Sequence, residues 1–412
     1  MFISKKHRKT MKKSKNFKII SLNQNIENTP IIKEGSNQWV LWGQKNDYPI
    51  QLLNLYSSSP IHKSCCDFLA TCILGAGIDW NRMKLNESET YPNFNDSWQS
   101  FLYKIALDYI IFGGFSFQII KNKDNKTYSY YHQPFSTVRL EKVDSEGDIN
   151  FAYLCKDWQK TNTYKPQRID LLNFTDDKKV AMGKSYLFYF ADYNCFDEYY
   201  PNPYYSSALN SIQSDAKLQT FDLSAIVNNF TPSGILTLNP VSDDEERDAI
   251  LKNINATFSD AENANNLIIT FKNSNEDTPA SFTPIQSNSE GVNLFQDTNE
   301  RVVNRIMAAH RIPSKALIGM PMDSTGFSNE GSLLQTAYQL LELTHISPMR
   351  NKIFGYINTL FAMNGIDTQI TVKPLSFNLT TNTSEQPATN DVKEIDDNNI
   401  NYDDKITSTT TK

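Results

Sequence analysis

Apolar residues in the first part of the chain recur at helical spacing in two segments, and glycines close both. One segment covers residues 61–73 and stops at Gly75, and the other covers residues 97–112 and stops at Gly113. Glycine readily adopts the left-handed conformation that ends helices, so each segment is predicted to be a helix with a glycine stop. An aromatic, turn-rich stretch, 39–49, precedes them.

Short runs of aromatic and β-branched residues follow, separated by polar turns such as Asp-Ser-Glu-Gly-Asp. These side chains suit the pleated surface of a sheet, and the polar residues between the runs favour turns. Four strands are predicted, over residues 115–120, 128–132, 137–143 and 149–154. Helices followed by such strands indicate the α+β class.

A long amphipathic helix is predicted over residues 206–229. Its apolar residues recur in steps of three, four and seven, and its other side is polar and carries Asp215, Gln219 and Asp222. This spacing places the apolar residues on one helix face. Pro232 lies just beyond the pattern and stops the helix.

The next segment is predicted to be a compact insert. Ser242-Asp-Asp-Glu245 has the form of a capping box and opens a helix through residue 258, and a strand covers 267–271. The acidic residues 243–246 could also be metal ligands, but a helix start accounts for them without a metal.

A second long helix is predicted over residues 295–310, with Arg301 and Arg305 on one face and apolar residues on another. Pro313 ends it, because the residue before a proline avoids the helical conformation. A loop over 317–330 leads to a last helical region that extends through residue 357. A short strand, 369–373, closes the folded part.

Composition indicates a globular chain with polar tails. Of the 412 residues, 39% are hydrophobic, which is enough to build a core. The basic arm, residues 1–16, and the polar tail, residues 380–412, are expected to be disordered. The arm is either a solvated tail or a nucleic-acid or partner contact. Its candidate DNA contacts are Lys5, Lys6, Arg8, Lys9, Lys12 and Lys13.

Charge and cysteine usage narrow the possible partners. The formal net charge of −6 has the wrong sign for tight DNA binding, although DNA that must slide past the protein is still allowed. The five cysteines form no CxxC pair, which favours a reducing compartment. No membrane span or signal peptide is predicted.

The sequence lacks the familiar enzyme motifs. It has no GxxxxGK[ST], GxGxxG, HExxH or GxSxG pattern, and its five histidines are scattered singly. His310, beside the apolar face of its helix, is predicted to be packed or interfacial rather than a ligand. We therefore expect no catalytic residue, no cofactor and no metal.

Several segments resemble portal proteins of tailed bacteriophages. One runs from Arg301-Val-Val-Asn-Arg-Ile-Met-Ala-Ala-His-Arg-Ile-Pro-Ser-Lys-Ala-Leu-Ile-Gly319 to Phe327-Ser-Asn-Glu330 and Ser347-Pro348. In that family a helix ends in an apolar-Pro step, and an aromatic-Ser-Asn-Glu loop and a proline-containing helix follow. Three earlier segments fall in the family's order: Trp42-Gly-Gln-Lys-Asn-Asp-Tyr-Pro49, Ile73-Leu-Gly-Ala-Gly-Ile78 and Tyr200-Pro-Asn-Pro-Tyr-Tyr-Ser-Ser-Ala-Leu209.

The resemblance implies a portal fold with an α/β wing, a two-helix stem, a small α/β clip and a reduced or absent helical crown. The implied divisions are a wing over 17–204, a first stem helix over 205–230, a clip over 231–294, a second stem helix over 295–311, a tunnel-loop region over 312–330 and a wing return over 331–379.

It also implies a function. The chain would form a ring, usually dodecameric in the family, at the portal vertex of the virion, after assembly in the host cytoplasm. Double-stranded DNA would pass through the ring. The implied partners are the terminase large subunit, the head-to-tail adaptor, and the major capsid and scaffolding proteins.

Two groups of residues become candidate functional sites on this resemblance. The stem group is Leu209, Ile212, Asp215, Gln219, Asp222, Ile226, Arg301 and Arg305. The tunnel-loop group, predicted to face the channel, is Gly319, Met320, Met322, Asp323, Ser324, Thr325 and Gly326. The alternative for the loop is an ordinary surface connection between helices.

Two rival functions stay open from the residues. A metal-dependent nuclease of the packaging machinery would use Asp243 and Asp244, and would cut DNA with Mg²⁺. Another phage structural or ligand-binding module, suggested by the aromatic content, would be a stable monomer. A ring with a central hole would distinguish the portal from both.

Overall fold

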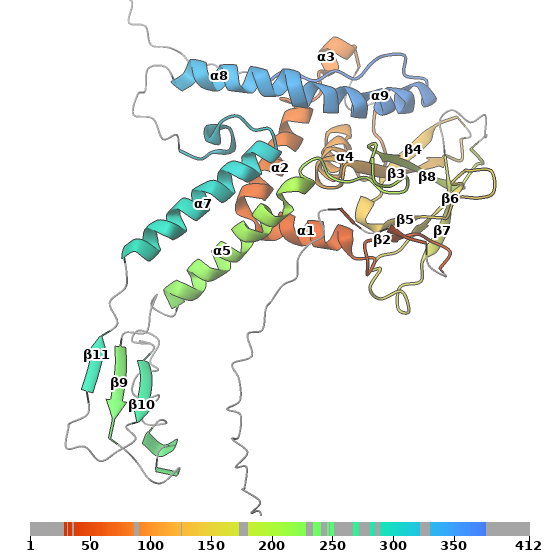
Figure 1. Cartoon of the computed structure of the whole chain (residues 1–412). Helices are drawn as coiled ribbons and strands as arrows, with labels where there is room; N and C mark the ends of the chain where they lie inside the picture. Colours follow the sequence, from red (N-terminus) through yellow and green to blue (C-terminus); the bar gives the residue numbers. More distant parts are fainter. Residues whose placement is uncertain are drawn as a thin grey trace, which may run out of the picture. The chain divides into compact units, whose positions relative to one another are not determined.

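The protein mixes helices with strands, which confirms the α+β class (Figure 1). Its structure is a computed structural model. The residues it describes are 29–30, 32–34, 37–85, 90–124, 126–172, 180–227, 234–239, 245–246, 248–250, 267–271, 281–284, 289–321 and 330–375.

The main part of the structure, called the body below, consists over its described residues of four helices and a six-stranded sheet. The helices are α1 (Tyr48–Ser58), α2 (Pro60–Leu74), the single turn α3 (Trp80–Met83) and α4 (Trp98–Phe112). The helices α2 and α4 agree with the prediction, whereas α1 was not predicted. Its proline at the first turn favours a helix start, since that position needs no backbone N–H donor.

A six-stranded sheet forms the other part, in the order β4-β3-β8-β7-β6-β5. Among its paired strands, only β7 and β8 run parallel. The helix α4 packs on the sheet, with the rings of Phe101 and Phe117 5.8 Å apart. The strands are β3 (Gly114–Lys121), β4 (Tyr128–His132), β5 (Val138–Leu140), β6 (Phe151–Leu154), β7 (Gln167–Leu171) and β8 (Ser185–Ala191).

Two long helices, α5 (Leu209–Val227) and α7 (Ser289–Ala309), contact each other side by side (Figure 1). A 3-10 turn, η3 (Ser206–Ala208), leads into α5. The helix α7 begins earlier than the predicted residue 295.

The insert between the long helices contains a three-stranded sheet in the order β10-β9-β11. Strand β10 (Leu267–Phe271) was predicted, whereas β9 (Gly234–Leu238) and β11 (Ser281–Pro284) were not. Of the predicted helix over 242–258, residues 245–246 and 248–250 are helical, and the rest lies outside the described residues.

The last helical region, residues 330–363, is continuous. After η4 (Lys315–Ile318) come α8 (Glu330–Leu341), a π-helical turn η5 (Glu342–Ile346) and α9 (Ser347–Met363). Pro348 lies in the first turn of α9. A proline inside a helix clashes with the carbonyl four residues earlier, and a wider π turn relieves such a clash.

The predicted strand over 369–373 is wrong. Its backbone instead pairs with the loop after α2: the Asp79 N–H donates to the Thr371 carbonyl at 2.9 Å, and the Lys373 N–H donates to the Gly77 carbonyl at 2.8 Å. Only an isolated bridge, Ile78 to Val372, forms there among the described residues. The partner is a turn rather than a strand, so no ladder develops.

Candidate functional site

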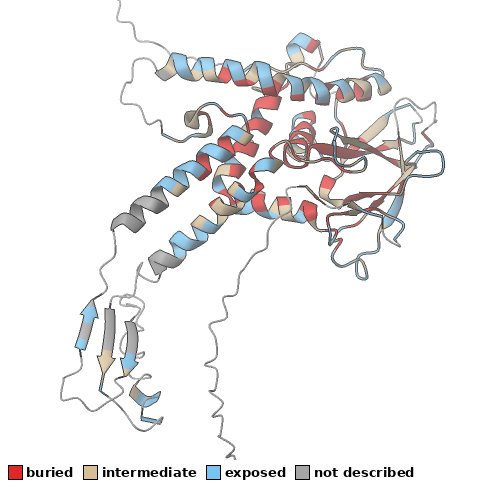
Figure 2. Cartoon of the chain, in the orientation of Figure 1, coloured by how far each residue is buried: buried red, intermediate tan, exposed pale blue. Residues whose placement is uncertain are grey.

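The residues predicted for the stem fall into two groups by burial (Figure 2). Where α5 meets the body, side chains are buried, and farther along α5 and on the outer face of α7 they are exposed. The buried group is Leu209, Ile212 and Asp215, and the exposed group is Gln219, Asp222, Arg301 and Arg305. Ile226 belongs to the last turn of α5.

Asp215, which was predicted on the polar side of helix α5, is buried. Its side chain is buried against the start of α2, where its Oδ2 accepts the Ser59 hydroxyl at 2.6 Å and the Ile61 N–H at 3.5 Å. Ser59 is the N-cap of α2 and accepts the His62 N–H at 3.2 Å. A carboxylate at a helix N-terminus is stabilised by the unpaired N–H groups there.

One helical turn further along α2, two histidines join it to α7. His62 Nδ1 lies 2.9 Å from His310 Nε2, and the Tyr204 hydroxyl lies 2.8 Å from His310 Nδ1. The ring of Tyr205 stacks on His310 at 4.9 Å. Burial lowers the pKa of His62 to about 3 and lowers the pKa of His310 well below its ordinary value, so both imidazoles are neutral. His310 is fully buried.

Two of the segments that carry the family resemblance meet in space. The ring of Trp42 stacks on that of Tyr200 at 4.6 Å, nearly parallel. The Tyr200 hydroxyl donates to the Val40 carbonyl at 2.7 Å and accepts the Leu140 N–H at 3.1 Å. The segment that opens α5 is thereby fixed to the edge of the six-stranded sheet.

A buried arginine lies beside this contact. Arg139 donates to Asn46 and to the carbonyl of Val138, and its guanidinium lies 5.6 Å from the ring of Trp42 and 5.0 Å from that of Trp158. Burial lowers the pKa of Arg139 to about 10, so it remains charged at neutral pH. Its contacts hold the 39–49 segment against β5.

The chain shares its fold with a protein of gene transfer agent particles. Compared with a chain of the virion of the native particle, the TM-score is 0.51 at 13% sequence identity, over 84% of this chain and 86% of that chain.

The same values hold for a chain in the neck of the native particle, computed with C12 symmetry. A chain in the neck of the empty particle, computed with C6 symmetry, gives a TM-score of 0.51 at 13% identity over 81% of this chain. No protein-family model matches the sequence, and no curated protein matches it.

The predicted tunnel loop is described only at its start. Gly319 ends η4 in the left-handed conformation, with φ of 81°, and is exposed together with Pro321, while Met320 is half-buried. The other members, Met322, Asp323, Ser324, Thr325 and Gly326, lie outside the described residues, as do the six candidate DNA contacts of the basic arm. Their placement stays a prediction. Within the described helices, none is long and apolar enough to cross a membrane.

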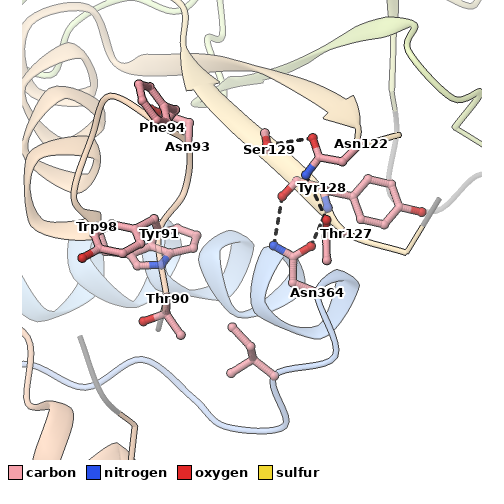
Figure 3. Close-up of a pocket in the computed structure, with 11 residues that line it drawn as sticks. Thr90, Tyr91, Asn93, Phe94, Trp98, Asn122, Thr127, Tyr128, Ser129 and Asn364 are labelled. Carbon is pink, nitrogen blue, oxygen red and sulfur yellow. Dashed lines mark hydrogen bonds between the residues drawn. The ribbon is translucent and has the colours of Figure 1, made fainter. Parts of the chain in front are cut away.

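A surface pocket of about 660 Å³ lies beside the edge strand β4 (Figure 3). Asn364, the residue that follows α9, binds the outward-facing backbone groups of Tyr128: its Oδ1 accepts the Tyr128 N–H at 2.7 Å and its Nδ2 donates to the Tyr128 carbonyl at 3.1 Å. Asn93 donates to the Tyr130 carbonyl at 2.6 Å, and the Tyr130 N–H donates to the Pro92 carbonyl at 2.7 Å. The described lining carries no titratable acid, lysine, arginine, histidine or cysteine.

Sequence reasoning missed the roles of Asp215, His62 and Arg139. Each depends on a partner far along the chain: 156 residues separate Asp215 from Ser59, and 248 separate His62 from His310. A local signal existed only for α2, where the Ser59-Pro60 pair marks a helix start. No spacing pattern in the sequence identifies Asp215 as the carboxylate that binds the start of α2.

Proposed function

We propose that the chain is a portal-type subunit of a tailed phage or phage-like particle, which closes into a ring at the head-to-tail junction. The fold shared with a protein of a particle neck carries this proposal. The likeness extends over more than four-fifths of both chains. It agrees with the sequence segments that resemble portal proteins, which were identified independently of the fold.

In this proposal the two long helices, α5 and α7, form the stem. Both connect to the body at one end, through Asp215 and His310, and they bracket an insert with its own small sheet. Copies arranged side by side could place these helices around an axis. Identical contacts between neighbouring copies form a closed ring when the rotation from one copy to the next divides a full turn. The C12 symmetry of the similar particle neck favours twelve copies.

In this proposal the ring conducts double-stranded DNA and catalyses no reaction. The insert between α5 and α7 docks the terminase during packaging and the adaptor afterwards, and the body contacts the capsid and scaffolding proteins. The exposed Arg301 and Arg305 on α7 and the exposed Asp222 on α5 give the helix pair a mixed charge. Mixed charge avoids tight binding to phosphates.

The test is the assembly state of the purified chain. Negative-stain microscopy and mass photometry are expected to show a closed ring with a central hole. Monomers or dimers alone, across salt and protein concentration, would contradict the proposal. Cutting of DNA with Mg²⁺ that is lost when Asp243 and Asp244 become Ala would favour the nuclease instead.

A second test addresses the channel. Asp323→Lys is expected to slow or stall DNA packaging while rings still assemble, because a ring of cations in the lumen would bind phosphates. Asp367→Lys is the matched control, since Asp367 is an exposed carboxylate outside the loop. Normal packaging by the Asp323 variant would show that the loop lies away from DNA.

A further inference from the structure

Three buried side chains of metal-ligand type converge where α2 meets the end of α7. His62 and Cys66 lie one helical turn apart on α2, and His310 directly follows α7. Their ligand atoms all lie within 4.8 Å of one another. All three side chains have no exposed surface. The arrangement belongs to neither the proposed channel nor the proposed docking surfaces.

We infer that His62, Cys66 and His310 bind one Zn²⁺ ion and thereby join α2 to α7. Two imidazole nitrogens and one thiolate are donors that Zn²⁺ prefers, and they would fill three of its four tetrahedral positions. The inference is independent of the ring, since it concerns a single chain.

The donors could share one ion once the Cys66 side chain turns: its Sγ lies 3.7 Å from His62 Nδ1 and 3.8 Å from His62 Nε2, beside the ring rather than on the Nδ1 lone pair. Tetrahedral zinc with ordinary bond lengths sets its nitrogen ligands about 3.3 Å apart and a nitrogen and a sulfur about 3.6 Å apart. Here His62 Nδ1 lies 2.9 Å from His310 Nε2 and 3.7 Å from Cys66 Sγ. The two rings would need to separate by a few tenths of an ångström. Their direct hydrogen bond would be replaced by two bonds to the ion.

The surroundings supply the support that metal-binding histidines usually have. The Tyr204 hydroxyl, 2.8 Å from His310 Nδ1, can accept a hydrogen bond from Nδ1–H, which leaves the Nε2 lone pair directed at the trio. A neutral imidazole binds a metal ion through its unprotonated nitrogen and loses no proton on binding. Cys66 would release its thiol proton to solvent on binding, which leaves the ion and its ligands with one positive charge. The buried carboxylate of Asp215 lies against the start of the same helix, α2.

Such a site would hold a junction that a disulfide cannot hold in a reducing compartment. It would connect a body helix to one of the long helices through one ion. Metal binding to the folded state alone stabilises it, so the melting temperature depends on metal concentration.

The probe is Co²⁺, added to the full chain after removal of metal by a chelator and back-titrated with Zn²⁺. One equivalent of Co²⁺ is expected to give intense visible bands of a tetrahedral site and a near-ultraviolet thiolate-to-cobalt band, which Zn²⁺ abolishes. Free Zn²⁺ at one hundred times its Kd is expected to raise the melting temperature by roughly 5 °C.

Cys66→Ser is expected to remove the thiolate band, whereas Cys65→Ser should keep it. Cys65 is an equally buried thiol one residue away and outside the trio, so it is the matched control. His310→Gln should weaken Co²⁺ binding at least tenfold. The absence of a thiolate band in the unmodified chain overturns the inference, whether or not the variants fold. A band that survives Cys66→Ser, or that Cys65→Ser also removes, overturns the assignment of the ligand.

Discussion

The two halves of α5 differ in what they contact, although one helical pattern runs through both. In the first half, Ile212 and Asp215 are buried against the body; in the second, Gln219, Asp222 and Leu223 are exposed, Leu223 by 64% (Figure 2). The first half is therefore defined by contacts within one chain. The second half presents an apolar side chain to solvent, where another copy can bury it.

The largest effect should come from the buried half. Ile212→Ala is expected to lower the free energy of unfolding by about 2–5 kcal/mol, because it leaves a cavity in a fully buried site. Urea denaturation monitored by circular dichroism measures this. The exposed Leu223→Ala serves as the control and should change it by less than about 0.5 kcal/mol. Equal losses for both would show that the two halves do not differ.

Asp215→Ala should have an intermediate effect. It removes the acceptor of the Ser59 hydroxyl and leaves that buried group without its partner, at a cost of about 1–3 kcal/mol. Asp215→Asn retains an acceptor and should cost less. Asp222→Ala, a change of the same side chain on the exposed half, is the control. An unaltered urea midpoint for Asp215→Ala would mean that this carboxylate does not stabilise the junction.

We expect Leu223→Ser to change the stability of the isolated chain little and to weaken ring assembly. Its free energy of unfolding should change by less than about 0.5 kcal/mol. The fraction of protein in rings, measured by mass photometry over a dilution series, should fall. Rings that persist at the same concentrations as in the unmodified protein would show that the distal half of α5 faces solvent in the assembly.

The smallest effect on stability is expected from deletion of residues 1–18, because these residues were predicted to lie outside the fold. The deletion should instead flatten the dependence of log K on log salt for DNA binding, since each neutralised phosphate contributes about −0.9 to that slope. Fluorescence anisotropy with a labelled duplex measures it. If the slope does not change, the phosphate contacts lie elsewhere on the chain.

Secondary structure was predicted correctly from the sequence where an apolar repeat is bounded by residues that start or end a helix. The helices α2 and α4 begin at serine caps and end at glycines, and both were found as predicted. Strand β8 was missed although Leu187 and Phe188 are buried in it, because its apolar run had no partner visible nearby. It pairs with β3, more than sixty residues earlier.

The candidate site was less accessible to sequence reasoning than the fold. Asp215 looked like a solvated residue because neighbouring positions are polar, and only the start of α2, folded against it, makes it a buried acceptor. His62 and His310 appeared as two single histidines. Their contact is a consequence of tertiary packing, which spacing along the chain does not encode.

The capped edge of β4 has a consequence for how copies of this chain meet. Unpaired N–H and C=O groups on an outer strand invite indiscriminate pairing with the strands of other molecules, which leads to fibres or amorphous aggregates. Asn364 and Asn93 occupy those groups at Tyr128 and Tyr130. Contacts between copies at this edge must then be made by side chains, whose shapes and charges discriminate between surfaces. The two asparagines thus remove a route to indiscriminate strand pairing at this edge.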